Sequence, residues 1–190
     1  VEKVKEKEFR ATFEIKTKAL YGKLPVAFRM MQEILTESKL TDERRLKEIL
    51  SMAKSRLQMR FQSSGHTTAA LRAMSYASPL SKLKDLTSGI GYYEIVKQIE
   101  EHFEEEKDTL IKNLQTLTKL LFRPENMMVS YTAAREGMEG LEKLVSELKA
   151  KLFTEPVQGQ PCVIHCEKKN EGFKTSSKVQ YVARAGNFID

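Results

Sequence analysis

The sequence has no tryptophan, only two cysteines and three histidines, and no long apolar run among its 190 residues. Two cysteines cannot supply the disulfide framework of a small secreted domain, so a reducing compartment is expected. A membrane span needs about 18 consecutive apolar residues. The opening residues, VEKVKEKEFR, lack the apolar stretch of a signal or transit peptide. These absences predict a cytoplasmic protein with no membrane partner.

The net charge of +6 is concentrated in residues 1–60, which hold 15 basic and 9 acidic residues. Four arginines in this part form a possible basic surface: Arg44, Arg45, Arg56 and Arg60. We expect the last three to point to different sides of a helix, which makes a scattered surface and not a stripe. No signature of a nucleic-acid-binding module accompanies them, so a solvated helix face is the preferred interpretation and nucleic acid is an unlikely partner.

Hydrophobic periodicity predicts a helix-rich chain with two strands. Residues 8–20 alternate between apolar and polar side chains, which indicates a half-buried strand, and residues 126–134 indicate a short, largely buried one. Residues 80–89 are expected to form a loop. Apolar residues at helical spacing predict helices at 25–38, 42–61, 66–77, 95–99, 108–122 and 138–153. This order predicts an α+β fold with helices layered on one side of a small sheet.

Composition shifts near Phe153, where TEPVQGQP has the proline and glycine content of a connector. We therefore expect an α+β domain over 1–153, a connector over 154–175, and the opening strand of a following domain over 176–190. The chain starts without Met, and its last predicted strand has no later sequence to pair with. We expect a piece of a longer protein.

His66 lies in the stretch FQSSGHTTAALRAMSYAS, beside Ser63, Ser64 and Gly65. A catalytic triad needs a nucleophile and a base within hydrogen-bond reach, and a third group that orients them. The Gly-x-Ser-x-Gly turn that presents such a serine is absent. The preferred interpretation is that His66 and the neighbouring hydroxyls cap a helix start, and an active site at His66 is the alternative.

His102 opens the sequence HFEEE, which is close to the inverted zinc motif His-x-x-Glu-His. That motif places two histidine ligands one helical turn apart, and here Glu106 stands in the second ligand position. We expect a solvent-facing histidine and no metal at this position.

The stretch CVIHC holds Cys162, His165 and Cys166. A zinc site would need a second pair of ligands elsewhere in the chain. In a strand the two cysteines would share a face about 13 Å apart, which is too far for a disulfide. Two buried thiols are expected.

Five ordered phrases carry a family resemblance: LTESKLTDERRLKEIL, SRLQMRFQSSGHTTAALRAMSYAS, SGIGYYEIVKQIEEHF, NMMVSYTA and YVARAGNF. Together they resemble the presequence-protease branch of the pitrilysin and insulinase-like zinc metallopeptidases, over residues 8–190. The most specific part is the Ser-Gly-His before the alanine-rich helix, followed by the Ser-Gly-Ile-x-Tyr-Tyr that contains Tyr92 and Tyr93. This part resembles the start of the second, non-catalytic half of such enzymes.

The resemblance implies a parent enzyme with two halves that close over unfolded peptide, with zinc bound by the N-terminal half. An arginine and a tyrosine that hold substrate would lie beyond Asp190. The resemblance thus implies that this chain is a chamber-forming third domain, inactive alone and without its own cofactor. Its partners would be the catalytic half of the same polypeptide and peptide substrates. The resemblance also allows an organelle as the alternative to a cytoplasmic location.

Within that resemblance, five residues become candidates for a structural role or for the chamber wall: Ser64, Gly65, His66, Tyr92 and Tyr93. The family supplies no catalytic role for His66. The alternative function is a free-standing helical binding or scaffold protein, with a basic helix that contacts nucleic acid.

Overall fold

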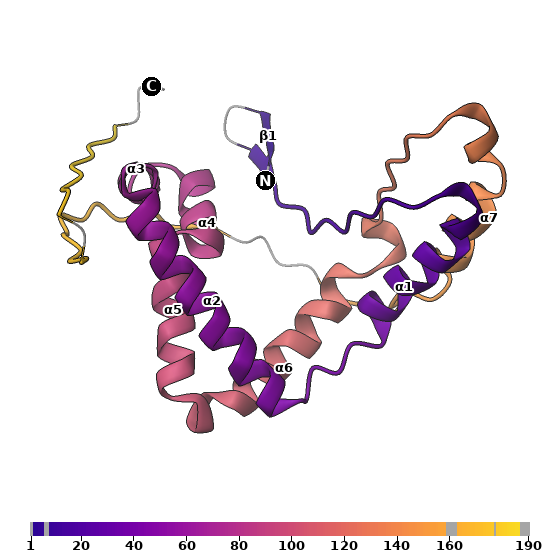
Figure 1. The fold of residues 1–190 in the computed structure, drawn as a ribbon, viewed down its shortest axis with the longest axis horizontal. Coiled ribbons are helices and arrows are strands. Elements are labelled where there is room, and N and C mark those ends of the chain that lie inside the picture. Colours follow the sequence, from indigo (N-terminus) through magenta and orange to yellow (C-terminus); the bar gives the residue numbers. More distant parts are fainter. Residues whose placement is uncertain (1, 6–7, 159–162, 177, 187–190) are drawn as a thin grey trace. The chain divides into compact units, whose positions relative to one another are not determined.

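The computed structural model describes residues 2–5, 8–158, 163–176 and 178–186 (Figure 1). Helices dominate this part of the chain. The α-helices are α1 Leu24–Thr36, α2 Glu43–Ser63, α3 Gly65–Ser75, α4 Pro79–Ser88, α5 Ile90–Glu101, α6 Phe103–Leu121 and α7 Leu141–Lys149. The 3₁₀ helices are η1 Tyr21–Lys23, η2 Pro124–Asn126 and η3 Arg135–Met138. None of the helices described is long and apolar enough to cross a membrane.

The chain divides into two compact units. The first unit contains residues 1–12, 43–107 and 160–190, and the second contains residues 13–42 and 108–159. The division falls within α6, so the first turn of this helix belongs to the first unit.

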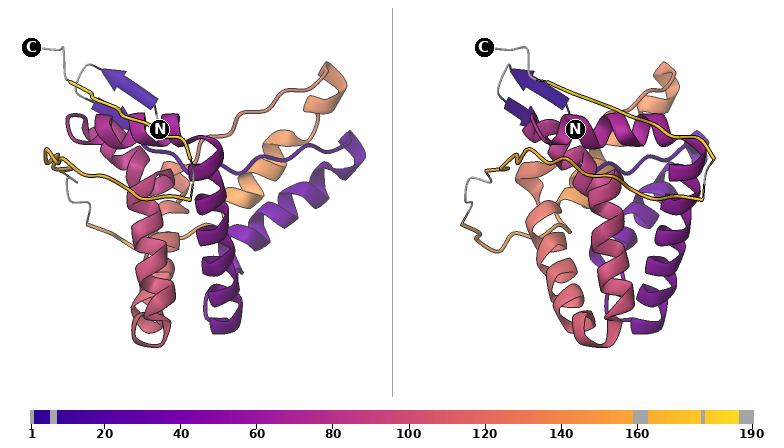
Figure 2. Two further views of the ribbon diagram at one scale, coloured as in Figure 1. Left: turned by 60° about the vertical axis from the view of Figure 1, so that its left-hand side comes forward. Right: turned by 90° about the vertical axis from the view of Figure 1, so that its left-hand side faces the viewer.

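Helices α2 to α5 form the body of the first unit. α2 and α5 lie side by side, and α4 packs against both α3 and α5 (Figure 2). Leu57 of α2, Ala73 of α3 and Val96 of α5 are buried, and so is Phe103 at the start of α6. Burial of these apolar side chains is the main force that holds the helices together.

Local signals in the sequence define the boundaries of α4. Ser78 precedes the helix, and its Oγ accepts a hydrogen bond from the backbone N–H of Ser81 at 3.4 Å. Pro79 occupies the first turn, where its missing N–H would have no partner in the helix. Gly89 has an extended backbone and separates α4 from α5.

The second unit has its core between α1 and α7, where Leu24, Phe28 and Leu148 are buried together. Partly buried hydrophobic residues surround this cluster: Leu35, Met127, Tyr131, Leu141, Leu144 and Val145. α7 begins after Gly140, whose φ of +74° lies in the left-handed region that favours glycine.

The strand predicted at 8–20 is confirmed only over β2, Glu8–Arg10, which pairs antiparallel with β1, Glu2–Lys5. Residues 11–20 have no regular structure, so the prediction is wrong there. Alternation makes one face of a segment apolar, but it does not supply backbone hydrogen-bond partners. No described strand lies beside these residues.

The strand predicted at 126–134 is also wrong, because η2 ends at Asn126 and residues 127–134 form neither helix nor strand. Met127 and Tyr131 pack against the core of the second unit, which accounts for the apolar pattern without a sheet. The helix-rich class is confirmed. The prediction of helices layered on a small sheet is not supported, since the described residues contain one two-stranded sheet.

All six predicted helices are present, with shifted ends, as α1, α2, α3, α5, α6 and α7. The loop expected at 80–89 is wrong, because α4 extends through Ser88. The described residues of 176–190 contain no strand. The domain boundaries at 1–153, 154–175 and 176–190 remain predictions.

We predict that Phe28→Ala lowers the free energy of unfolding of the second unit by about 3 kcal/mol, because it opens a cavity between α1 and α7. The measurement is urea unfolding, followed by amide hydrogen exchange of α7. Ile34→Ala is the matched control on the same helix, since Ile34 is 52% exposed. Equal losses in the two variants would contradict this core.

Candidate functional site

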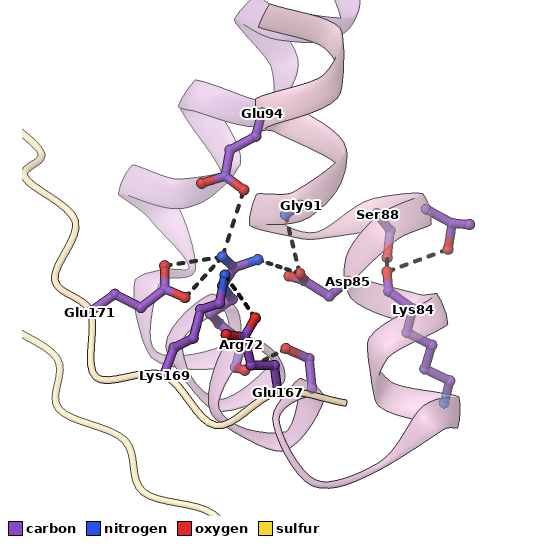
Figure 3. A network of polar contacts seen from close by, with 11 residues as sticks. Arg72, Lys84, Asp85, Ser88, Gly91, Glu94, Glu167, Lys169 and Glu171 are labelled. Atoms are coloured by element: carbon purple, nitrogen blue, oxygen red, sulfur yellow. Dashed lines mark hydrogen bonds and ion pairs between the residues drawn. The ribbon is translucent and has the colours of Figure 1, made fainter. Parts of the chain in front are cut away.

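The most deeply buried polar cluster described in the first unit is built around Arg72 of α3. The Arg72 side chain is only 9% exposed, and its Nη1 donates a hydrogen bond to Oδ2 of Asp85 in α4 at 2.7 Å. Asp85 is fully buried, and its Oδ2 also accepts a hydrogen bond from the backbone N–H of Gly91 at 3.2 Å. The ion pair thus links α3, α4 and the first turn of α5 (Figure 3).

Two glycines leave room for the Asp85 carboxylate. A Cβ on Gly91 would lie 2.7 Å from Asp85 Oδ2, and a Cβ on Gly89 would overlap Asp85 Oδ1. Neither position accepts a side chain without a shift of the α4–α5 junction. The Gly-Ile-Gly of the phrase SGIGYY therefore serves the close approach of a buried carboxylate.

The open edge of Arg72 faces a segment that lies far away in the sequence. Both carboxylate oxygens of Glu171 lie 3.0 Å from Arg72 Nη2, and a carboxylate oxygen of Glu94 lies 3.6 Å from the same nitrogen (Figure 3). The Phe173 and Tyr76 rings lie near the guanidinium, with centroids 5.5 and 6.0 Å from Cζ. Cation–π attraction adds to the charge pairing at these distances.

The electrostatics of the cluster favour its charged state. Burial alone would lower the pKa of Arg72, but its hydrogen bonds to Glu171 and Asp85 outweigh burial and raise that pKa. Burial alone would raise the pKa of Glu171, but hydrogen bonds from Arg72 and Tyr76 hold it below its ordinary value. Burial, and then the hydrogen bond to Glu171, raise the pKa of Tyr76.

Two buried atoms of the pair, Arg72 Nε and Asp85 Oδ1, have no hydrogen-bond partner within the described part of the chain. A buried guanidinium can donate five hydrogen bonds and a carboxylate can accept about four, so this pair is not saturated. Unmade bonds of this kind are costly in a buried site. The cluster therefore depends on attraction between its charges more than on complete hydrogen bonding.

The predicted Ser64-Gly65-His66 group lies at the junction of α2 and α3. Gly65 is the first residue of α3, and His66 is exposed. The Ser64 side chain makes no capping hydrogen bond, and the hydroxyls of Thr67 and Thr68 donate to the Ser64 carbonyl. The position at a helix start is confirmed, but capping by these hydroxyls is wrong.

A tyrosine from the far end of the chain lies over this junction. The ring of Tyr181 lies 5.9 Å from the ring of His66 between centroids, and a Cβ on Gly65 would lie 2.6 Å from Tyr181 Cδ2. Gly65 therefore allows an aromatic ring to approach the start of α3. This contact of His66 is aromatic packing, and not the pairing of base and nucleophile that a triad needs.

The two predicted tyrosines of α5 have different surroundings. Tyr93 packs edge-on against Phe61 of α2, with centroids 5.4 Å apart, and its hydroxyl accepts a hydrogen bond from Gln58 at 3.2 Å. Tyr92 is half-buried. Tyr93 thus joins α2 to α5, which is a structural role; a chamber-wall role for either residue remains a prediction.

The arginines of α2 form a less scattered surface than expected. α2 is one uninterrupted helix, and at about 100° per residue Arg45, Arg56 and Arg60 fall within about 60° of one another. The expectation that they point to different sides is wrong. Arg44 and Arg45 pair with Glu48 at 3.3 and 3.1 Å, so part of the positive charge is neutralised.

The remaining metal and thiol candidates are separate from the Arg72 cluster. His102 is exposed at the end of α5, with Nδ1 3.8 Å from a carboxylate oxygen of Glu105. His165 is exposed and Cys166 is a free thiol, while Cys162 lies outside the described residues. Within the described ranges, no group of three or more His, Cys, Asp or Glu side chains is placed to hold a metal ion.

A groove of about 530 Å³ in the second unit is the other candidate site. Lys39, Lys112 and Lys119 line it, and Lys119 lies 3.5 Å from Glu155. Several of its hydroxyl groups are engaged with their own backbone; for example, Thr36 Oγ1 donates to the Gln32 carbonyl at 2.9 Å. Positive charge gathers at the groove, whereas the Arg72 cluster combines positive charge with burial and fixed partners.

A family of domains described as associated with subfamily C of peptidase family M16 matches residues 1–99. The chain belongs to this family, and the resemblance drawn from the five phrases is confirmed. The matched residues include α1 to α4 and most of α5, and with them Arg72, Asp85, Gly91 and Glu94. Glu171 lies outside the match.

Known relatives agree with this assignment. Protein HypA of Clostridium perfringens is 32% identical over 184 residues, which make up 97% of this chain and 19% of that protein. Presequence protease 1, chloroplastic/mitochondrial, of Arabidopsis thaliana is 25% identical over 91% of this chain and 16% of its own length. A mitochondrial presequence protease of Xenopus laevis is 27% identical over 63% of this chain and 12% of its own length. The chain spans about a fifth or less of the length of these relatives.

The sequence analysis missed Arg72 and Glu171, the centre of the cluster. Arg72 lies inside an alanine-rich helix, and its position relative to the neighbouring apolar residues resembles that of a charged residue that faces solvent. Asp85 fell in a stretch interpreted as a loop. The signal that could have drawn attention was the Gly-Ile-Gly after an aspartate-bearing helix, since paired glycines often mark close approach.

We predict that Arg72→Met lowers the free energy of unfolding of the first unit by about 3–5 kcal/mol, because Asp85 then stays buried without its partner. The double variant Arg72→Met/Asp85→Leu should recover most of this loss, since both buried charges are gone. Urea unfolding of the two variants and the wild type measures the difference. A double variant as unstable as Arg72→Met would contradict the ion-pair account.

We also predict that the Glu171 contact is lost in acid. Its pKa is lowered on folding from the ordinary value of 4.5, so its stabilising contribution is fully present above that value and disappears as pH falls through the lower folded pKa. The difference in unfolding free energy between wild type and Glu171→Gln should therefore be largest near neutral pH and vanish in acid. Glu167→Gln is the control, because Glu167 is 78% exposed and pairs with Lys169. A difference that persists below the folded pKa of Glu171 would contradict the contact.

Proposed function

We propose that this chain is a non-catalytic domain of a zinc-dependent peptidase resembling presequence protease, and that it helps to enclose unfolded peptide substrate. The proposal rests on the match to one relative. Nearly the whole of this chain aligns with that relative, but the aligned part is only a small share of the relative's own length. The match to HypA takes in 97% of this chain but 19% of that protein, and the chain belongs to a peptidase-associated family. A domain of this kind works beside a catalytic region.

The chemistry of the chain supports a scaffold role. The sequence contains no His-x-x-Glu-His motif, so the proposal places zinc and its general base in the catalytic half of the same polypeptide. The buried charges of Arg72 and Asp85 are used to hold α3, α4 and α5 together. The candidate residues Ser64, Gly65, His66, Tyr92 and Tyr93 would then shape a wall and would not take part in bond cleavage.

The location follows from the parent protein. The relatives from Arabidopsis and Xenopus have organelles in their names, and the sequence alone favoured the cytoplasm. We propose that the parent acts on peptides either in the compartment where it is synthesised or in an organelle that imports it. Cell fractionation distinguishes these two locations.

The test is to express the product of the native reading frame around this chain. We expect a polypeptide about five times as long as the aligned segment, as in HypA, with one His-x-x-Glu-His motif and one bound zinc per chain. It should cleave unfolded peptides, and replacement of the motif glutamate by glutamine should abolish this activity. The 190-residue chain alone should bind no stoichiometric zinc and cleave no peptide.

The alternative is a free-standing helical scaffold with a basic surface on α2. The observation that favours it is the common side of Arg45, Arg56 and Arg60 in the continuous helix. A reading frame limited to about this chain, together with RNA or DNA binding that weakens steeply with salt, would establish the alternative and overturn the peptidase proposal.

A further inference from the structure

The face of α3 that carries Arg72 has the features of a built binding site. The guanidinium is buried and fixed from behind by Asp85, which is itself held by the Gly91 N–H. These groups come from α3, α4 and α5, so the receptor for Glu171 is complete within the helices. An arginine fixed in this way is prepared to bind a carboxylate at little entropic cost.

The group that fills this face comes from a segment without helix or strand. Glu171 follows Arg72 by 99 positions, and the described residues 163–176 have no regular secondary structure. Glu171 and Phe173 both contact Arg72, as residues i and i+2 of an extended chain do, since they share one side. The segment crosses in front of α3 in Figure 3, with Glu171 directed at the guanidinium.

Contacts continue along the same segment. The Ser176 hydroxyl accepts a hydrogen bond from Gln62 of α2 at 2.9 Å, and the Tyr181 ring lies against His66. The Arg72 contact is the most strongly charged of these, and it requires only a carboxylate followed two residues later by an aromatic ring. Another polypeptide with the same pattern would present the same groups.

We propose that the face of α3 around Arg72 is a peptide-binding site that takes an extended acid-x-aromatic sequence from a second polypeptide, in the place that Glu171 and Phe173 of this chain fill. The Glu171 carboxylate is the competitor held in the same molecule, and Glu94, 3.6 Å from Arg72 Nη2, is the nearest alternative partner when Glu171 leaves. This site is independent of the peptidase proposal, because its ligand is bound and not cleaved.

The test uses the full 190-residue chain and a fluorescein-labelled peptide, EKKNEGFKTS, which copies residues 167–176. Fluorescence anisotropy should show that the Glu171→Gln chain binds this peptide. The wild-type chain should bind it at least about tenfold more weakly, since a tethered competitor acts at roughly millimolar effective concentration. Glu167→Gln is the matched control and should behave as wild type, because Glu167 pairs with Lys169 and not with Arg72.

Two further arms separate a specific site from general adhesion. A peptide with glutamine in place of the second glutamate, EKKNQGFKTS, should lose at least about tenfold in affinity for the Glu171→Gln chain. Adding Arg72→Met/Asp85→Leu to that chain should abolish binding, with circular dichroism confirming that the helices persist. Equal binding of the two peptides, equal binding by wild type and Glu171→Gln, or no binding up to about 1 mM would each overturn the proposal.

Discussion

The ion pair between Arg72 and Asp85 is the constraint on which the first unit depends. Removal of two charges from water costs several kcal/mol each, and their attraction offsets this only when the geometry is good. Here the two groups lie where three helices meet and form a hydrogen bond of 2.7 Å, and a backbone N–H supplies a further donor. Either charge would be costly to bury without the other, so the pair favours an arrangement of α3, α4 and α5 that keeps the two side chains in contact.

The glycines at the α4–α5 junction follow from that pair. A fully buried carboxylate needs space around both of its oxygens, and the junction supplies it because Gly89 and Gly91 lack side chains. The same residues belong to the phrase that indicated family membership. One motif thus carries the recognition signal and the structural requirement, with no catalytic role needed to explain it.

The sequence predicted the helices well because amphipathic spacing is a local property. Leu57 in α2 and Val96 in α5 are buried, as the helical spacing of apolar residues predicts for a core side chain. The prediction of a sheet was wrong for the opposite reason, since a strand depends on a hydrogen-bonding partner that can lie anywhere in the chain. The apolar pattern at Met127 and Tyr131 arises because these residues pack against helices. Loop structure at 80–89 was expected because α4 has a proline at its start and polar residues along its length.

The centre of the site could not be predicted from the spacing of residues in the sequence either. Arg72 looks like any charge on a helix until the fold buries it, and its contact with Glu171 joins residues that no local pattern connects.

The sequence separation of that contact also sets an order in time. During synthesis at about 5–20 residues per second, Arg72 leaves the ribosome roughly 5–20 s before Glu171, because 99 positions separate them. Asp85 and Glu94 follow Arg72 much sooner, so α3, α4 and α5 can assemble with these two carboxylates as the first partners of the guanidinium. The C-terminal segment then meets a surface that is already formed, and it arrives at that surface as a ligand would.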